Sequence, residues 1–515
     1  DFWFNHFNVT ARGGNIQTAL VYDRDAIRPH VLSPFREILG ATARHPGMLH
    51  YLDNAKSRAK QGTQTPVGPA TRGGGINENY GRELMELHTL GVDGGYTQQD
   101  VQEVARAFTG WTIYPYNNPQ RARRTDRQIQ GMRGVVREGQ FLFRPDWHDA
   151  EAKTILGESF PAGRGIDEGE RVLDLLAAHP STARHLSRKL AVRFVSDEPP
   201  EDIVDRLADA FSASGGDTRA VLRALVESPE FWAAATGASG QPTKVKTPFE
   251  LVVSAVRATG ARMERTKALA SYLEKMGEPI YHREPPTGFP DHAAAWINPG
   301  LLLNRMSFGL RLALGQIRGV RVDLDALTGG QEPESAEAAL RSYGAVLLPG
   351  RDLGPTLDTL EQMVRAQDVA ARVDAAAQAA SPDAPGSGTS PEASGDEDPG
   401  AGATMGAAPE VDMDAALAPD AERDRSREPR PGETARQARQ RRRAEQQARR
   451  AATAARRAAR DGEAAVVAAP TPFASDTASD DDDPFSAPEA ARFDPRISAG
   501  TVVGVLLGSP AFQRQ

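Results

Sequence analysis

The sequence predicts a mostly α-helical fold: a multi-helix globular domain that carries one small β-hairpin and is interrupted by a long disordered insertion. Apolar residues recur three and four positions apart in most segments before residue 367, as they do on the buried face of a helix. Helix start and stop residues separate these segments. Between residues 368 and 490 aromatic residues nearly vanish, so too little apolar surface remains to offset the entropy of the chain.

Capping signals mark the starts of several helices. Thr97 and Asp100 match a capping box. The apolar residues after it fall on one face at 3.6 residues per turn, namely Val101, Val104, Ala105, Phe108 and Trp111. Asp167 with Glu170 is expected to open another helix, which Pro180 ends. The same pattern continues through several further segments and indicates a helical body.

Strand-like alternation is scarce, and one segment is a convincing strand. Phe141 to Phe143 combines strand-forming residues with nearby turn signals. We expect it to pair with Thr154 to Leu156 across the intervening loop. This would place a small hairpin on the helical body.

The composition divides the chain into three parts. Residues 1–367 form the helical domain, and its first residues resemble the middle of a helix, so we expect an N-terminal segment to be missing. Residues 368–490 are rich in Ala, Pro and Asp, then in Arg, then in acidic residues, and are expected to be disordered. Residues 491–515 regain apolar residues and are expected to form a C-terminal helix that docks back on the helical domain.

Composition also limits the chemistry. The absence of cysteine excludes disulfides, thiolate zinc sites and thiol nucleophiles. A formal charge of -8 argues against general binding of polyanions, although the Arg-rich segment at residues 436–460 is either a solvated helix or coil, or a contact for RNA or another anionic surface. No apolar run approaches the roughly 20 residues that span a bilayer. Walker, dinucleotide-binding and zincin motifs are missing, so no nucleotide cofactor is expected.

The stretch GRELMELHTLG, residues 81–91, places two carboxylates in an apolar helical pattern. On a helical wheel Glu83 falls inside the apolar stripe and Glu86 on its edge. A buried carboxylate must be paired, hydrogen-bonded or protonated. Glu83 therefore either pairs with an arginine, such as Arg28 or Arg305, or shares a site with groups from elsewhere in the chain.

The stretch WHDAEAK, residues 147–153, places His148 and Asp149 in the predicted hairpin loop. An imidazole and a carboxylate in a loop can converge on a metal ion or transfer protons. An ion pair between Asp149 and Lys153, or an Asx-type turn, explains the same residues structurally. His6 lies beside aromatic residues and is either a hydrogen-bonded core histidine or a further metal ligand.

Several blocks of the sequence, taken in order, resemble one bacterial family. The central block NENYGRELMELHTLGVDGGYTQQDVQEVARAFTGWT is the most specific, and HDAEAKTILG, LLPG and the terminal SPAFQ accompany it. Together they resemble the domain-of-unknown-function 1800 family, for which no activity can be carried over. Members of this family resemble exported proteins and are often encoded beside a second uncharacterised, sulfatase-like family. The resemblance implies an extracytoplasmic location, in the periplasm or at the cell surface.

Two hypotheses follow. The first is a helical binding or assembly module of the cell envelope with a protein partner there, in which Glu83, Glu86, His148 and Asp149 form a buried polar network. The second is a metal-assisted hydrolase or other enzyme, in which His148 and Asp149, with Glu83 or Glu86 and His6, hold a divalent metal or transfer protons. A short distance between Glu83 and His148 beside an open pocket would favour the enzyme.

Overall fold

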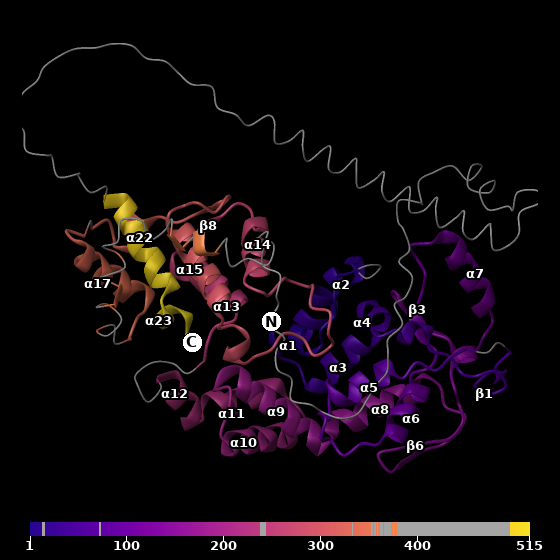
Figure 1. Ribbon diagram of the computed structural model, residues 1–515. Coiled ribbons are helices and arrows are strands. Elements are labelled where there is room, and N and C mark those ends of the chain that lie inside the picture. Colours follow the sequence, from indigo (N-terminus) through magenta and orange to yellow (C-terminus); the bar gives the residue numbers. More distant parts are fainter. Residues whose placement is uncertain are drawn as a thin grey trace, which may run out of the picture. The chain divides into compact units, whose positions relative to one another are not determined.

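The computed structural model describes residues 1–12, 16–71, 74–236, 244–331, 333–351 and 495–514, with scattered positions between 354 and 377. The described residues belong to one compact unit and are mostly helical with a few short antiparallel strands, which confirms the predicted fold class (Figure 1). The insertion predicted for residues 368–490, including its Arg-rich segment, lies almost entirely outside the described residues.

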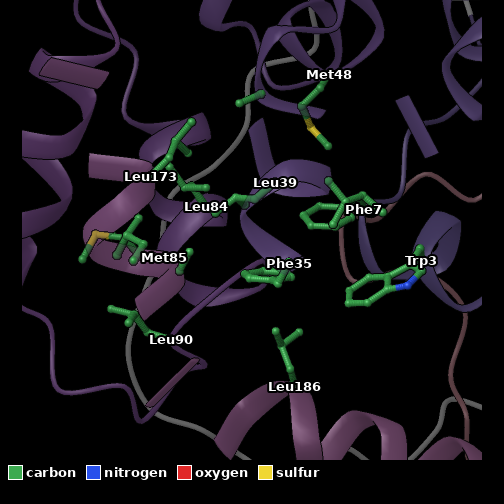
Figure 2. Close-up of a cluster of buried hydrophobic side chains, with 14 of the residues drawn as sticks. Trp3, Phe7, Phe35, Leu39, Met48, Leu84, Met85, Leu90, Leu173 and Leu186 are labelled. Atoms are coloured by element: carbon green, nitrogen blue, oxygen red, sulfur yellow. The ribbon is translucent and has the colours of Figure 1, made fainter. Parts of the chain in front are cut away.

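The first half of the chain is helical, and each of its described helices except Pro119–Ile129 packs around one hydrophobic cluster. Its helices are α1 (Phe2–His6), α2 (Ile16–Tyr22), α3 (Phe35–Arg44), α4 (Pro46–Tyr51), α5 (Asn79–Glu86), α6 (Gln98–Ala107), α7 (Pro119–Ile129), α8 (Ile166–Ala178), α9 (Pro180–Phe194), α10 (Glu201–Ala213), α11 (Thr218–Val226) and α12 (Pro229–Thr236). A π-helical turn at Asp23–Ile27 and 3₁₀ turns at Arg28–His30, Asn54–Lys56 and Pro145–Trp147 connect some of them. Phe7, Phe35, Leu39 and Leu84 lie in the centre of this cluster (Figure 2).

The second half continues the helical body. Its elements are α13 (Pro248–Ala258), α14 (Lys267–Lys275), a 3₁₀ turn (Ala293–Ala295), α15 (Pro299–Ala313), α16 (Leu324–Leu327), α17 (Ala336–Leu347), α22 (Pro495–Gly508) and α23 (Pro510–Gln513). These helices bury a second hydrophobic cluster, which also includes Val373. Within the described ranges, none of the helices combines the length and the apolar character that crossing a bilayer requires.

The predicted capping box at the start of α6 is confirmed, because Thr97 and Asp100 exchange side-chain and backbone hydrogen bonds. The five apolar residues predicted to share a face, Val101, Val104, Ala105, Phe108 and Trp111, are all buried. The helix predicted to open at Asp167 is α8, which begins one residue earlier, at Ile166. Asp167 lies inside the first turn, where its Oδ1 accepts a hydrogen bond from the backbone nitrogen of Gly165 at 3.0 Å.

The strands form small antiparallel pairings, and the partner expected for Phe141 to Phe143 is wrong. This strand, β5, lies between β3 (Trp111–Ile113) and β4 (Val136–Glu138). The segment that had been expected to pair with it instead forms β6 (Lys153–Ile155), which pairs with β7 (Glu158–Phe160). The remaining pairs are β1 (Gln64–Thr65) with β2 (Gly68–Pro69), and β8 (Arg262–Met263) with β9 (Val320–Arg321).

The C-terminal helix α22 packs along α15 through glycines. A Cβ atom added at Gly504 would lie 2.6 Å from the Cα of Leu310, and one added at Gly508 would lie 3.2 Å from the Cα of Met306. A contact of 2.6 Å leaves no room for a side chain at Gly504, and one of 3.2 Å at Gly508 is tighter than most Cβ contacts. The backbones of the two helices therefore approach closely, and α22 joins the same compact unit as α15.

Polar contacts fix the end of the chain beside these helices. The buried guanidinium of Arg305 donates to the backbone oxygen of Lys246 at 2.9 Å and to Oε1 of Gln513 at 3.4 Å. The backbone nitrogen of Lys246 donates to the carbonyl of Gln513 at 2.8 Å. Arg305 thus fixes α23, and it is not the partner of Glu83 that the sequence suggested.

Candidate functional site

The WHDAEAK stretch connects β5 to β6 and is anchored by backbone hydrogen bonds. The nitrogen of Arg144 donates to the carbonyl of Gly110 at 2.9 Å, and the nitrogen of Ala59 donates to the carbonyl of Trp147 at 2.8 Å. Gly110 has a φ of 83°, and a Cβ there would lie 2.6 Å from the carbonyl oxygen of Arg144. Only glycine suits this position. The loop is therefore held rigidly where His148 and Asp149 enter the core.

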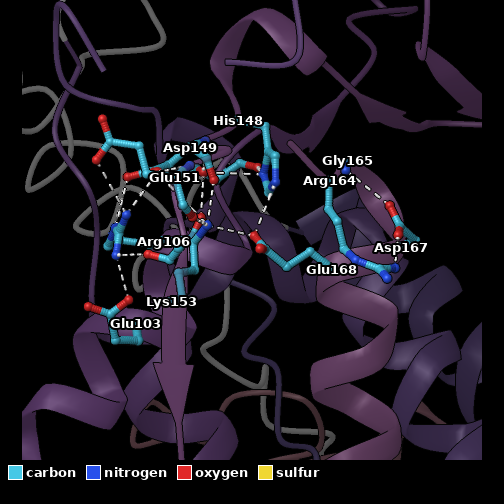
Figure 3. A network of polar contacts seen from close by, with 12 residues as sticks. Glu103, Arg106, His148, Asp149, Glu151, Lys153, Arg164, Gly165, Asp167 and Glu168 are labelled. Atoms are coloured by element: carbon cyan, nitrogen blue, oxygen red, sulfur yellow. Dashed lines mark hydrogen bonds and ion pairs between the residues drawn. The ribbon is translucent and has the colours of Figure 1, made fainter. Parts of the chain in front are cut away.

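His148 is fully buried and faces a carboxylate from another element. Its Nδ1 lies 2.9 Å from the carbonyl oxygen of Thr109, and since a carbonyl only accepts hydrogen bonds, Nδ1 carries a proton. Its Nε2 lies 3.2 Å from Oε2 of Glu168 on α8 (Figure 3). The imidazole and the carboxylate therefore lie side by side, although Nε2 of His148 and both carboxylate oxygens of Glu168 have no partner with hydrogen-bond geometry among the described residues.

Lys153 completes the surroundings of Glu168. Its ammonium lies 2.7 Å from Oε2 of Glu168 and donates to the backbone oxygens of Asp149 at 2.6 Å and Glu151 at 2.9 Å (Figure 3). Two of the three N–H groups of the ammonium donate to these backbone oxygens, and the contact with Glu168 is an ion pair without hydrogen-bond geometry. The side chains of Lys153 and Glu168 are both 0% exposed. Two backbone hydrogen bonds and the ion pair with Glu168 stabilise the lysine in the core.

Asp149 points the other way, toward α6. Its two carboxylate oxygens accept hydrogen bonds from Nε and Nη2 of Arg106, at 2.9 and 3.0 Å. Its Oδ1 also accepts from the backbone nitrogen of Glu151 at 3.1 Å, an Asx-type turn, and lies 3.8 Å from Nζ of Lys153. Both structural interpretations of Asp149 that the sequence allowed are therefore present.

We call Arg106, His148, Asp149, Lys153 and Glu168 the Glu168 network. Its two formal positive charges, on Arg106 and Lys153, balance the two carboxylates. It connects α6, the β5–β6 loop, β6 and α8 (Figure 3). Charge balance and close pairing are what a buried set of charges needs in order to persist. The network has the geometry of a structural clamp, since its polar groups face one another.

Glu83 and Glu86 lie elsewhere, on α5. Neither arginine suggested for Glu83 reaches it, because Arg28 pairs with Asp23 at 2.7 Å and Arg305 fixes the chain end. Burial raises the pKa of Glu83 to about 7, and the neighbouring charge of Glu86 acts in the same direction. Glu83 is only partly buried, which is less than its place in the apolar stripe suggested. It is a proton donor and acceptor near neutral pH.

His6 belongs to a third group. Its Nε2 donates to the carbonyl of His88 at 3.1 Å, and its ring centre lies 6.1 Å from that of His88 and 6.3 Å from that of His185. Burial lowers the pKa of all three imidazoles, to about 3 for His88 and about 4 for His185, and the nearby charge of Lys189 adds to the effect. His6 is thus a neutral, hydrogen-bonded core histidine.

The candidate residues consequently fall into three groups and do not form a single centre. His148 and Asp149 join the Glu168 network, Glu83 lies near Glu86, whose charge raises its pKa, and His6 lies with two other histidines. Across the part of the chain that the structure describes, no three His, Asp or Glu side chains are grouped so that they could hold a metal ion.

Sequence reasoning missed two members of the network. Arg106 and Glu168 lie on helices distant in sequence from WHDAEAK. Glu168 had a signal: it precedes the buried Val172 and Leu176 by four and eight residues, so it falls on the apolar face of α8. A carboxylate at such a position needs a partner. Which partner it meets depends on tertiary structure.

Comparison with known proteins identifies the family and nothing finer. Neither the curated proteins nor the solved structures compared with this chain include a match. One family model, described as a protein of unknown function (DUF1800), matches residues 1–514. The match includes the α5–α6 region, the WHDAEAK loop and the C-terminal helices. The chain belongs to the DUF1800 family of proteins of unknown function.

Proposed function

We propose that this protein is a helical binding or assembly module and that the Glu168 network holds its binding surfaces in place. The main support for the proposal is the ion pair between Lys153 and Glu168. Both side chains are fully buried, and their charges pair with each other. A catalytic acid or base must reach a substrate atom. In the Glu168 network the carboxylates, the ammonium and the imidazole reach one another instead.

The bacterial cell envelope is the proposed place of action, with a protein partner there. This part of the proposal rests on the resemblance of the family to exported proteins. The helical body supports it in a general way, since a rigid helical scaffold can present side chains to a partner at fixed spacing.

An enzyme is the second candidate, and Glu83 is the observation that favours it. A partly buried carboxylate with a pKa raised to about 7 is suited to proton transfer at neutral pH. Glu86 lies beside it, and Tyr96 donates to Oε2 of Glu86 at 3.3 Å. A hydrolase of this type would use Glu83 and Glu86 for proton transfer, and other groups would bind a divalent metal. The Glu168 network would then stabilise the surrounding fold.

Turnover assays on folded variants separate the two candidates. The purified full-length protein is assayed against ester, phosphoester, glycoside and peptide substrates, with and without Mg²⁺, Mn²⁺ or Zn²⁺. The binding module predicts no turnover above the buffer rate. Turnover that Glu83→Gln abolishes, while circular dichroism shows an unchanged fold, would establish the enzyme. His148→Gln is the parallel variant, and it should affect thermal stability alone.

A further inference from the structure

A cavity of about 690 Å³ lies beside β3, β5 and α7, separate from the groups described above. Four arginines line it, namely Arg58, Arg121, Arg124 and Arg144. One carboxylate, that of Asp146, also lines it, so the lining carries an excess of three positive charges. We call this cavity the arginine pocket. Its charge contrasts with the whole chain, whose formal net charge is -8.

Two of these arginines are held rigidly. The guanidinium carbon of Arg58 lies 3.3 Å from the ring centre of Trp147, and that of Arg144 lies 4.3 Å from it. Arg144 is further fixed by a bidentate pair with Asp146, at 3.0 and 2.6 Å, and by Oε1 of Gln128 at 2.9 Å. Guanidinium groups fixed in this way lose little conformational entropy when they bind a ligand.

Arg58 has an unused donor. Its Nε is buried and has no hydrogen-bond partner among the described residues. Burial, chiefly, and the nearby charge of Arg144 lower the pKa of Arg58, and an anion bound beside it would act in the opposite direction. A buried N–H group without a partner costs free energy. Because Arg58 lines the cavity, an oxyanion bound there is a candidate acceptor for this N–H group.

The other two arginines come from one face of α7. Arg121, Arg124, Thr125 and Gln128 line the cavity at helical positions i, i+3, i+4 and i+7, which fall on the same side of a helix. No carboxylate pairs with Arg121 or Arg124 among the residues that the structure describes. Arg123 and Arg127 belong to the same helix but do not line the cavity. The helix thus carries one arginine pair that faces the cavity and one that does not.

We propose that the arginine pocket binds a ligand that carries at least two phosphate, sulfate or carboxylate groups. Guanidinium groups bind such oxyanions through paired N–H donors, and the excess positive charge requires more than one anionic group to balance it. The cavity has the volume of a site for a small organic molecule. The partly exposed Trp147 and the walls formed by Ile113 and Leu142 add apolar contacts for the body of that ligand.

This proposal adds a class of ligand to the proposed binding function, and it rests on that function. Its test is independent of the turnover assays, because it measures binding at residues that lie outside both the Glu168 network and the Glu83 pair. A protein that turns over a substrate could still bind an anion in the arginine pocket, and a binding module could fail to bind one.

The test is calorimetric titration of the full-length protein with tripolyphosphate, a disulfated disaccharide and trigalacturonate, each at low and at physiological salt. Maltotriose serves as the uncharged probe. The pocket variant is Arg121→Gln/Arg124→Gln, and the matched control is Arg123→Gln/Arg127→Gln, which removes the same charge from the same helix. Both pairs lie on an exposed helix, so both variants are expected to fold.

At least one charged probe should bind with a dissociation constant below about 1 mM, and the three probes distinguish phosphate, sulfate and carboxylate as the source of charge. The pocket variant should weaken that binding at least tenfold, and the control variant by less than about twofold, because screening removes most long-range effects at physiological salt. Equal weakening by both variants would mean that binding depends on the overall charge of α7 and not on the pocket. This result would overturn the proposal. Absence of binding by all three charged probes would overturn it as well.

Discussion

Lys153 and Glu168 meet in the core of the protein, with Nζ and Oε2 2.7 Å apart and both side chains fully buried. They lie on β6 and α8, and the strand and the helix are joined through this pair to His148. Burying two charges costs several kcal/mol each, roughly, and close pairing of the two charges compensates for that cost. The network therefore stabilises one arrangement of the surrounding elements more than any other.

The bidentate contact between Arg106 and Asp149 gives a first prediction. Asp149→Asn leaves the guanidinium with a neutral partner and should lower the free energy of unfolding by about 2–3 kcal/mol. The matched control is Glu151→Gln, because Glu151 is 54% exposed and lies 3.7 Å from the same arginine. That change should cost less than about 0.5 kcal/mol. Urea unfolding of both variants measures the difference, and equal losses would contradict the assigned geometry.

The close approach of α22 to α15 gives a second prediction. In an exposed helix, Gly→Ala stabilises by about 1 kcal/mol through helix propensity. At Gly504 the added Cβ would lie 2.6 Å from the Cα of Leu310, and backbone cannot move away cheaply. We expect overpacking to dominate, so Gly504→Ala should lower stability by about 1–3 kcal/mol. A rise in the thermal midpoint would show that the two helices do not pack as closely as the structure has them.

Glu83 gives a third prediction, on the dependence of stability on pH. Its pKa is raised from 4.5 to about 7 in the folded protein, so between these values the folded state binds the proton more tightly than the unfolded state. Its contribution to stability is therefore present below pH 4.5 and is lost as the pH rises toward 7. Glu83→Gln should be about 1 kcal/mol more stable than the wild type at pH 8, a value reduced for partial exposure, and equal to it at pH 4.

Denaturant unfolding of both proteins from pH 4 to pH 8 measures this effect. Glu86→Gln is the companion variant, because it removes the second cause of the raised pKa of Glu83. It should shift the loss of stability to lower pH. Parallel stability curves for the wild type and Glu83→Gln would show that Glu83 is solvated like an ordinary surface carboxylate.

The partly buried His185 gives a fourth prediction, with the opposite sign. The pKa of His185 is lowered to about 4, chiefly by burial. As the pH falls from 6.5 to 4, the unfolded state therefore binds a proton at this histidine while the folded state stays neutral there. Stability should therefore fall over this range. His185→Gln should flatten this part of the curve, which a urea titration at several pH values would reveal. A slope identical to that of the wild type would mean that other groups govern acid unfolding.

The sequence predicted those features of the fold that depend on local patterns. The capping box at Thr97 and the buried face of α6 follow from spacing alone, and both were correctly placed. The pairing of β5 was wrong, because a short apolar strand pairs equally well with several partners and the choice depends on packing.

In the candidate sites, too, contacts between residues close in sequence could be predicted, and contacts between distant residues could not. WHDAEAK contained an ion pair and a turn that nearest neighbours in sequence could reveal, and Asp149 makes both. The partners Arg106 and Glu168 come from separate helices, and no spacing rule connects them to His148. The arginine pocket was missed for the same reason: Arg58, Arg121 and Arg144 are distant in sequence and meet only when β3, β5 and α7 come together.

A double-mutant cycle on Lys153 and Glu168 tests the central claim, that the Glu168 network is a structural clamp, most directly. Lys153→Met, Glu168→Gln and the double variant are unfolded in urea at pH 7. Each single change leaves a buried charge without its partner and should cost about 3–5 kcal/mol, whereas the double change removes both charges. We predict that the double variant loses at least about 2 kcal/mol less than the two single losses added together. Losses that add to within about 0.5 kcal/mol would contradict the clamp.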